Sequence, residues 1–169
     1  TDGVTALSII CSEIYSLNHN AGIAEYLVAH GAEESLEEAA ALGHLNIVKQ
    51  WTEQGEHMKV DSLYGTRVHN GDHALMSAII CNRLKVVKHL AKVGVSLRNE
   101  RNYGVGWLYY ACISPNTSLK MIKLLVRLGA DVNFNGGNSL TPLHVVTNQR
   151  KQNDSVSIAY YLRAHGATD

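Results

Sequence analysis

The stretch that decides the fold is residues 70–102, NGDHALMSAIICNRLKVVKHLAKVGVSLRNERN. It opens on a turn signal, Asn70-Gly71, followed by an apolar run that ends at Cys81. The second half sets an apolar face against a lysine-rich face at helical spacing, which predicts an amphipathic helix. Gly94 should end that helix, because glycine adopts a left-handed backbone conformation without strain. One such unit cannot bury its own apolar face and therefore predicts neighbours of the same kind.

The same unit recurs along the chain. A leucine in the first helix and a glycine after the second helix appear five times, at Leu7, Leu36, Leu75, Leu108 and Leu143, and at Gly31, Gly55, Gly94, Gly129 and Gly166. The first, fourth and fifth copies have extra residues where the two helices would be joined. These residues are polar or turn-forming, as expected of a lengthened surface turn. The repetition predicts an array of five helix pairs.

These units resemble the ankyrin repeats. The family opening, Asp-Gly-x-Thr-Pro-Leu-His, is approached by residues 2–8, DGVTALS, and its second half is matched by residues 141–144, TPLH. Residues 129–133, GADVN, match the family closing motif, and residues 42–48, LGHLNIV, match its middle. The resemblance covers nearly the whole chain. It implies an all-α ankyrin-repeat solenoid of five helix-turn-helix repeats with β-hairpin-like finger loops.

We expect a single ankyrin-repeat domain over residues 1–169, with repeats at about 2–32, 33–55, 70–99, 103–133 and 138–169. The finger between the first two repeats is nearly absent. The connection over residues 56–70 is instead lengthened, and it mixes β-branched and aromatic residues around Tyr64-Gly65. A longer β-hairpin finger is predicted there.

The two ends of the array differ in character. The first helix is apolar nearly all round, whereas a terminal repeat normally turns a polar face outward. We therefore expect the chain to come from a longer protein with more structure before Thr1. Arg163 stands where other repeats have Val28, Ala91 or Val126. A charge at that position predicts a domain end close to residues 166–169.

Composition narrows the class of protein. The chain has 169 residues, 46% of them hydrophobic, which predicts a folded domain. With 15 basic and 15 acidic residues the net charge is zero, so nothing points to nucleic acid or an anionic membrane. No apolar run is long enough to span a membrane. Three cysteines each fall in a predicted first helix: Cys11, Cys81 and Cys112. This position favours reduced thiols in the core over redox-active cysteines or metal ligands. Reduced thiols in turn favour a reducing, cytoplasmic compartment.

Motifs for catalysis or metal binding are not found. The chain has no GxxxxGK loop, no GxSxG elbow and no HExxH. The set His57, His69, His73 and Cys81 lacks the CxxC pairing of convincing zinc sites, so we predict no metal and no cofactor. The family resemblance implies that His44 and His144 hydrogen-bond the backbone within their repeats. A solenoid also offers a groove rather than a pocket closed to water, so a non-enzymatic protein is predicted.

The resemblance implies a concave surface built from the fingers and the first helices. The predicted partner-binding residues are Leu42, Tyr64, Asp72, Ile80, Tyr103, Val105, Trp107, Tyr110, Ile113 and Leu140. Five of them should form one apolar patch, because the third and fourth repeats have regular connections: Ile80, Tyr103, Val105, Tyr110 and Ile113. Two alternatives stay open. Ile80 and Ile113 could pack against each other, and Trp107 could pack into the neighbouring finger as a local core residue.

Two functions fit this surface. The first is a protein–protein interaction module, or scaffold, that binds a partner peptide or domain in the groove. The alternative is a regulatory or inhibitory protein, of effector or immunity type, that docks on an enzyme and blocks it with the finger over residues 56–70. Such an inhibitor would insert Tyr64 or His57. Both functions predict a protein partner, without nucleic acid or a membrane span.

Overall fold

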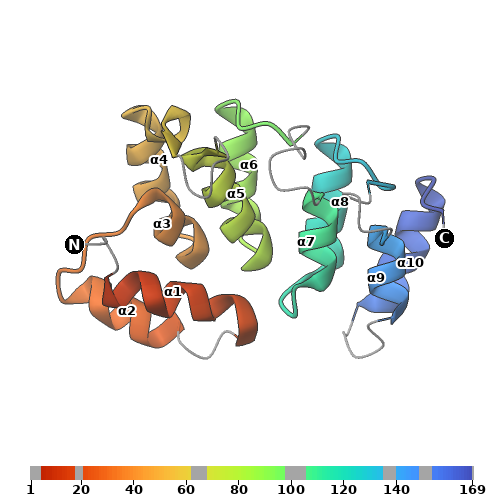
Figure 1. Cartoon of the computed structure of the whole chain (residues 1–169), viewed down its shortest axis with the longest axis horizontal. Coiled ribbons are helices and arrows are strands. Elements are labelled where there is room, and N and C mark those ends of the chain that lie inside the picture. Colours follow the sequence, from red (N-terminus) through yellow and green to blue (C-terminus); the bar gives the residue numbers. More distant parts are fainter. Residues whose placement is uncertain are drawn as a thin grey trace. The chain divides into compact units, whose positions relative to one another are not determined.

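The computed structural model describes residues 5–17, 21–61, 68–97, 106–134, 140–148 and 154–168. These residues form ten α-helices arranged as five consecutive pairs, as the repeated leucine and glycine predicted (Figure 1). The helices fall into two compact units, Thr1–Val95 and Ser96–Asp169. The expectation of a single domain stays a prediction, and each unit is described by itself. Among the described residues, no helix is both long enough and apolar enough to cross a membrane.

The first unit contains three helix pairs and a hairpin. Its helices are α1 (Ala6–Leu17), α2 (Ala21–Ala29), α3 (Leu36–Leu42), α4 (Leu45–Glu53), α5 (Asn70–Ile80) and α6 (Leu84–Lys92). A short 3-10 helix, η1 (Glu56–Met58), precedes strand β1 (Val60–Asp61), which pairs with β2 (Val68–His69). The pairing is antiparallel, with Val60 opposite His69. The predicted hairpin in the long finger is therefore confirmed at its base.

The second unit contains two helix pairs packed in two layers. They are α7 (Trp107–Ile113) with α8 (Leu119–Arg127), and α9 (Pro142–Asn148) with α10 (Ser155–Ala164). The first helices α7 and α9 lie against each other, and α10 lies against α8. Between the layers, large apolar side chains are fully buried, including Leu108, Ile122, Leu125, Leu143, Ile158 and Leu162. The amphipathic pattern of the second helices supplies half of this core.

Local signals set the helix ends. Ser35 caps α3 through a capping box, in which its hydroxyl accepts from the Glu38 backbone N–H at 3.3 Å and the Glu38 carboxylate accepts from the Ser35 N–H at 2.7 Å. The five glycines predicted to end the second helices all have positive φ: Gly31 95°, Gly55 80°, Gly94 99°, Gly129 95° and Gly166 89°. The repeat register read from the sequence is thus confirmed at each helix end.

One turn expected from the sequence is helical instead. Asn70 and Gly71 form the first residues of α5, which makes this helix longer than α3, α7 and α9, the first helices of the second, fourth and fifth repeats. Strand β2 leads directly into the helix, and Asp72 lies in its first turn, where a carboxylate interacts favourably with the helix dipole. The tertiary pairing of the finger thus overrides the local Asn-Gly turn preference. The prediction of a turn at Asn70-Gly71 was wrong.

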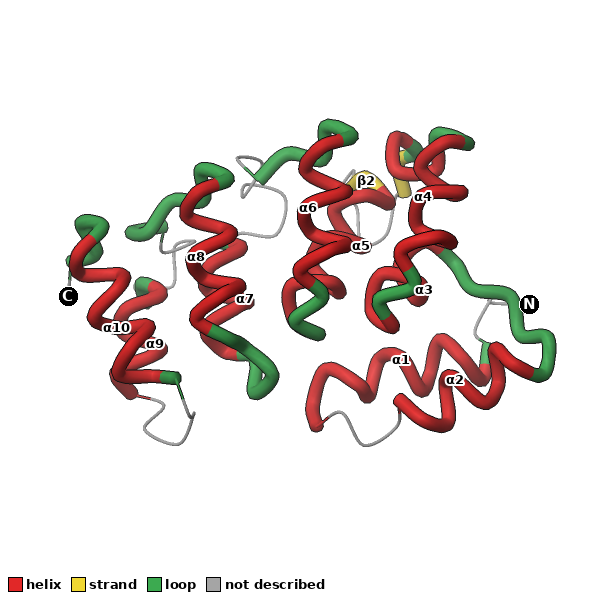
Figure 2. The backbone as a smooth tube through the Cα atoms, turned by 180° about the vertical axis from the view of Figure 1, so that it is seen from behind, coloured by secondary structure: helices red, strands yellow, loops and turns green. Residues whose placement is uncertain are grey.

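The first helix pair is oriented differently from the next two. In Figures 1 and 2, helices α3 to α6 run alongside one another, whereas α1 and α2 lie across the ends of α3 and α5. Leu7 and Cys11 of α1 share a core cluster with Ala41, Leu42 and Cys81 at those ends. We attribute the crossing to the missing finger, since residues 30–35 join α2 to α3 directly.

Candidate partner-binding surface

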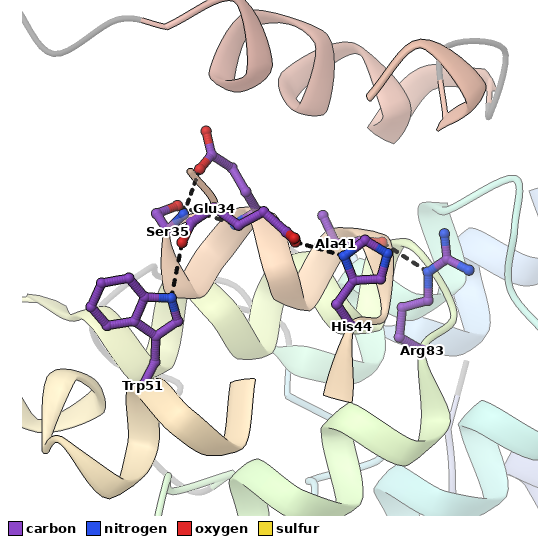
Figure 3. Close-up of polar contacts among 7 residues, drawn as sticks. Glu34, Ser35, Ala41, His44, Trp51 and Arg83 are labelled. Atoms are coloured by element: carbon purple, nitrogen blue, oxygen red, sulfur yellow. Dashed lines mark hydrogen bonds and ion pairs between the residues drawn. The ribbon is translucent and has the colours of Figure 1, made fainter. Parts of the chain in front are cut away.

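In the first unit, polar side chains tie α3 to its neighbours (Figure 3). The Trp51 Nε1–H donates to the Glu34 carbonyl at 2.9 Å, and His44 Nδ1 lies 2.7 Å from the Glu34 carboxylate. The Arg83 Nε–H donates to the Ala41 carbonyl at 2.8 Å, which links the end of α3 to the following repeat. Each of these groups has a structural partner within the unit. Two of these interactions lie within the second repeat and the Arg83 bond joins it to the third, so the cluster has a structural role.

The two histidines expected to bond the backbone behave differently. His144 Nδ1 accepts from the Thr141 backbone N–H at 3.3 Å, as the family resemblance implied. His44 instead pairs with a carboxylate, because Glu34 lies beside it with a side chain only 6% exposed. A buried carboxylate needs a hydrogen-bonding partner, and His44 provides it. The backbone prediction is confirmed for His144 and wrong for His44.

Two predicted partner-binding residues of the first unit are buried. Leu42 is 5% exposed and packs in the cluster that contains Leu7 and Cys11 of α1. Asp72 is 3% exposed within α5. Both side chains are therefore covered within the unit, Leu42 by its cluster with α1. Ile80, the last residue of α5, is half-buried.

In the second unit, Trp107 is a core residue. It is 1% exposed at the start of α7. The Tyr110 ring lies 6.4 Å from the Trp107 ring and 6.4 Å from the Tyr109 ring. Burial and the neighbouring Tyr109 raise the pKa of Tyr110, so its phenol stays protonated. Of the two interpretations left open for Trp107, the structure supports packing.

Exposed apolar side chains do occur on α7 and before α9. Ile113 ends α7 and is 37% exposed, and Leu140 precedes α9 and is 41% exposed. Tyr110 lies three residues before Ile113, so the two share one side of the helix. Asn148 is exposed on the adjacent α9 at the position equivalent to Ile113, five residues after the repeat leucine. We call Tyr110, Ile113, Leu140 and Asn148 the α7–α9 surface.

The five-residue patch expected at the groove centre stays a prediction. Tyr103 and Val105 lie outside the described residues, as does Tyr64 of the long finger. Ile80 belongs to the first unit, whereas Tyr110 and Ile113 belong to the second. Of the five patch residues, the structure therefore places together only Tyr110 and Ile113, which both belong to α7.

Metal ligands do not gather in the described part of the chain, where no group of three or more His, Cys, Asp or Glu side chains could hold an ion. The side chains of His57 and His69, two of the four residues considered for a metal site, lie outside that part. His73 is half-buried in α5, and Cys81 belongs to the α1–α3 core cluster.

The three cysteines are buried, as predicted. Burial raises the pKa of Cys11 and Cys112 to about 12 and that of Cys81 to about 11, with the Arg83 charge opposing the rise at Cys81. Because only the thiolate is nucleophilic, we expect very slow reaction of the folded chain with a thiol reagent at pH 8, and prompt reaction of all three thiols in denaturant. Absorbance of the released chromophore measures both rates. A thiol that reacts promptly in the folded chain would contradict this burial.

Comparison with known proteins places these helix pairs in a family. A family model of ankyrin repeats, in three copies, matches residues 36–136, which is more than half of the chain. The chain belongs to the ankyrin-repeat family. The match begins at Leu36, the first residue of α3, so the crosswise pair α1–α2 lies outside it. The fold class predicted from the sequence, an all-α ankyrin solenoid, is confirmed.

One curated protein is similar in sequence to this chain. Over 108 residues the chain is 36% identical to the BRCA1-associated RING domain protein 1 of Caenorhabditis elegans. The aligned part covers 63% of this chain and 14% of that protein. The ankyrin chain described here therefore corresponds to a small fraction of its relative.

The sequence pattern showed one lysine-rich helix face, but the uneven charge among the ankyrin repeats was missed. Helix α6 carries Lys85, Lys88 and Lys92, and α8 carries basic residues at the same three repeat positions, with no acidic residue on either helix. Residues 1–56 hold nine of the fifteen acidic residues and one of the fifteen basic residues. The net charge of zero therefore holds for the whole chain but not for its separate segments. The lysine spacing of three and four residues was the signal that could have shown this.

Proposed function

We propose that this chain is a non-enzymatic protein–protein interaction module that holds a partner peptide or domain on the α7–α9 surface. Ankyrin repeats are generally protein–protein interaction modules. The observation that carries the proposal is the exposure of Ile113 and Leu140 at positions that the family keeps on its binding face. Apolar side chains near an aromatic ring, here Tyr110, have the composition of a binding hot spot.

The pKa values of the described residues also support a binding role. Ankyrin repeats are typically non-catalytic. Burial is the largest cause of the raised pKa values of the three cysteines and Tyr110, and a raised thiol pKa disfavours the nucleophilic thiolate. Reduced, buried thiols fit a protein of a reducing compartment, and we propose the cytoplasm.

The test replaces both exposed side chains, Ile113→Asp with Leu140→Asp, and compares partner capture with thermal stability. The matched control is Ile23→Asp on α2, where Ile23 is 50% exposed. Partner recovered from native lysate on the immobilised chain is expected to fall at least about tenfold for the double variant and to stay unchanged for the control, because a charge would have to be desolvated in the interface. Both variants should melt close to the unaltered chain.

A second candidate function concerns the long finger. Met58 is 64% exposed and lies two residues before strand β1, so a large apolar side chain is exposed next to the paired strands β1 and β2. A regulatory protein that docks on and blocks an enzyme could use this element. Capture lost on Met58→Asp but kept by the Ile113 and Leu140 double variant would select this function and reject the α7–α9 surface.

A further inference from the structure

Helix α6 carries three lysines on one exposed face. Lys85, Lys88 and Lys92 follow one another at spacings of three and four residues, and all three side chains are exposed. Lys49 of α4 is also exposed, and it occupies the same repeat position as Lys88, six residues before the glycine. Helices α4 and α6 pack against each other, so the four lysines lie on neighbouring helices of the first unit. We call Lys49, Lys85, Lys88 and Lys92 the α4–α6 basic face.

The lysines of this face have no carboxylate partner in the described part of the chain. The ion pairs of the described residues are His44 with Glu34 and Lys59 with Glu56, and neither includes a lysine of the α4–α6 basic face. Glu53 is the one acidic residue of α4, and α6 has none. Four ammonium groups thus face water without a neutralising charge.

The stability of the fold does not explain these cations. Lys85 lies in the first turn of α6, where the positive end of the helix dipole disfavours a cation. Lysines three and four residues apart also repel each other and weaken a helix. The equivalent positions of the first, second and fifth repeats hold a single lysine among nine residues: Gly22, Glu25 and Ala29; Asn46, Lys49 and Glu53; Ser157, Tyr160 and Ala164. A second helix of this array therefore does not require lysine at these positions.

We propose that the α4–α6 basic face binds an acidic segment of a partner protein. Opposite charge is the chemistry that recognises this face. The three lysines of α6 span about 10 Å of the helix axis, a distance that about three extended residues cover. A segment with clustered Asp or Glu residues can therefore reach several ammonium groups at once. The face belongs to α4 and α6 alone, so the proposal is independent of the α7–α9 surface.

Nucleic acid fits this face less well than an acidic protein segment does. Single strands are usually bound with aromatic side chains on which bases stack, and arginine is favoured for phosphate recognition. The α4–α6 basic face has neither residue type. Residues 1–56 of the same unit hold nine of the fifteen acidic residues, so they would repel a long phosphate chain. A short acidic segment need not extend beyond the lysines.

Fluorescence anisotropy of a labelled peptide of alternating glutamate and serine tests this binding on the full chain. We expect saturable binding that weakens as the salt concentration rises, because exposed charges are screened. Replacing the α6 lysines, Lys85→Gln with Lys88→Gln and Lys92→Gln, should weaken the binding at least about tenfold. The variant should melt no lower than the unaltered chain, because the substitutions remove repulsion within α6.

The matched control makes the same change on α8, Lys120→Gln with Lys123→Gln and Arg127→Gln. It removes three positive charges from the same repeat positions, so the two variants have equal net charge. Lys123 already lies over the Tyr161 ring, 5.5 Å from its centroid, and the neighbouring α10 has Tyr160 where α4 has a lysine. We expect the control to keep the peptide affinity within about twofold, because distant exposed charges are screened.

Four outcomes would overturn the proposal. Absence of saturable peptide binding at low salt would remove the site. Equal losses in the α6 variant and the α8 control would show a general attraction to positive charge. Tighter binding of a single-stranded oligonucleotide of equal charge, with the same dependence on the α6 lysines, would assign the face to nucleic acid. A lower melting temperature of the α6 variant would assign its lysines to the stability of the fold.

Discussion

Replacing Trp107 with alanine is expected to lower the free energy of unfolding by about 3–5 kcal/mol, as for other buried tryptophans. Trp107 is 1% exposed and is the bulkiest fully buried side chain of the described residues. Its removal leaves a cavity at the start of α7 that the surrounding helices cannot close fully. Urea unfolding followed by circular dichroism measures the change. Because the chain has two compact units, the effect should appear in the transition of the second unit.

A matched control separates packing from recognition at this position. Tyr160→Ala removes another large aromatic side chain from the same unit, but from an exposed site, and should change stability by no more than about 0.5 kcal/mol. If Trp107→Ala left the unfolding midpoint unchanged, Trp107 would not be a core residue. The interpretation as a partner contact would then have to be restored.

Replacing Leu75 with alanine should cost about 2–5 kcal/mol in the first unit. Leu75 is fully buried in α5, the helix that packs along α3. The next residue, Met76, is half-buried, so Met76→Ala should cost clearly less. The pair tests the repeat register, because an error of one residue would reverse the order of the two effects. Equal midpoints for the Leu75 variant and the unaltered chain would contradict the register directly.

The helix pairs could be read from the sequence because their signals are local. A leucine in the first helix and a glycine with positive φ after the second depend on periodicity and backbone sterics, and both hold in all five repeats. The start of α5 could not be read in this way. Asn70-Gly71 is a turn signal in isolation, but the β1–β2 pairing delivers the chain directly into a helix there.

The orientation of α1 and α2 depends on packing that no local pattern encodes. Residues 39–42, Ala-Ala-Ala-Leu, are all buried, in a helix of seven residues. An apolar run of that density in so short a helix indicates a covered face, whereas the sequence interpretation placed one of its residues, Leu42, on the binding surface. Helix α1 supplies the cover and removes Leu42 from the candidate surface. In the second unit the two residues equivalent to Ala41, five after the repeat leucine, stay exposed: Ile113 and Asn148.

Side-chain identity alone could not separate core from surface at the fourth repeat. Trp107 and Tyr110 both belong to α7 and are both aromatic, yet one is buried and the other half-exposed. Their spacing of three residues places them on one side of the helix, so helical periodicity does not separate them either. Only the position of α9 decides which of them the unit covers.

Hydrogen exchange of the chain with and without its captured partner tests the proposed binding surface most directly. Binding through the α7–α9 surface predicts slower amide exchange in Trp107–Ile113 and in residues 140–148. Exchange in α2 (Ala21–Ala29) should not change, because that helix contributes nothing to the proposed surface. Protection confined to the finger or to the outer helices, with α7 and α9 unaffected, would contradict the account.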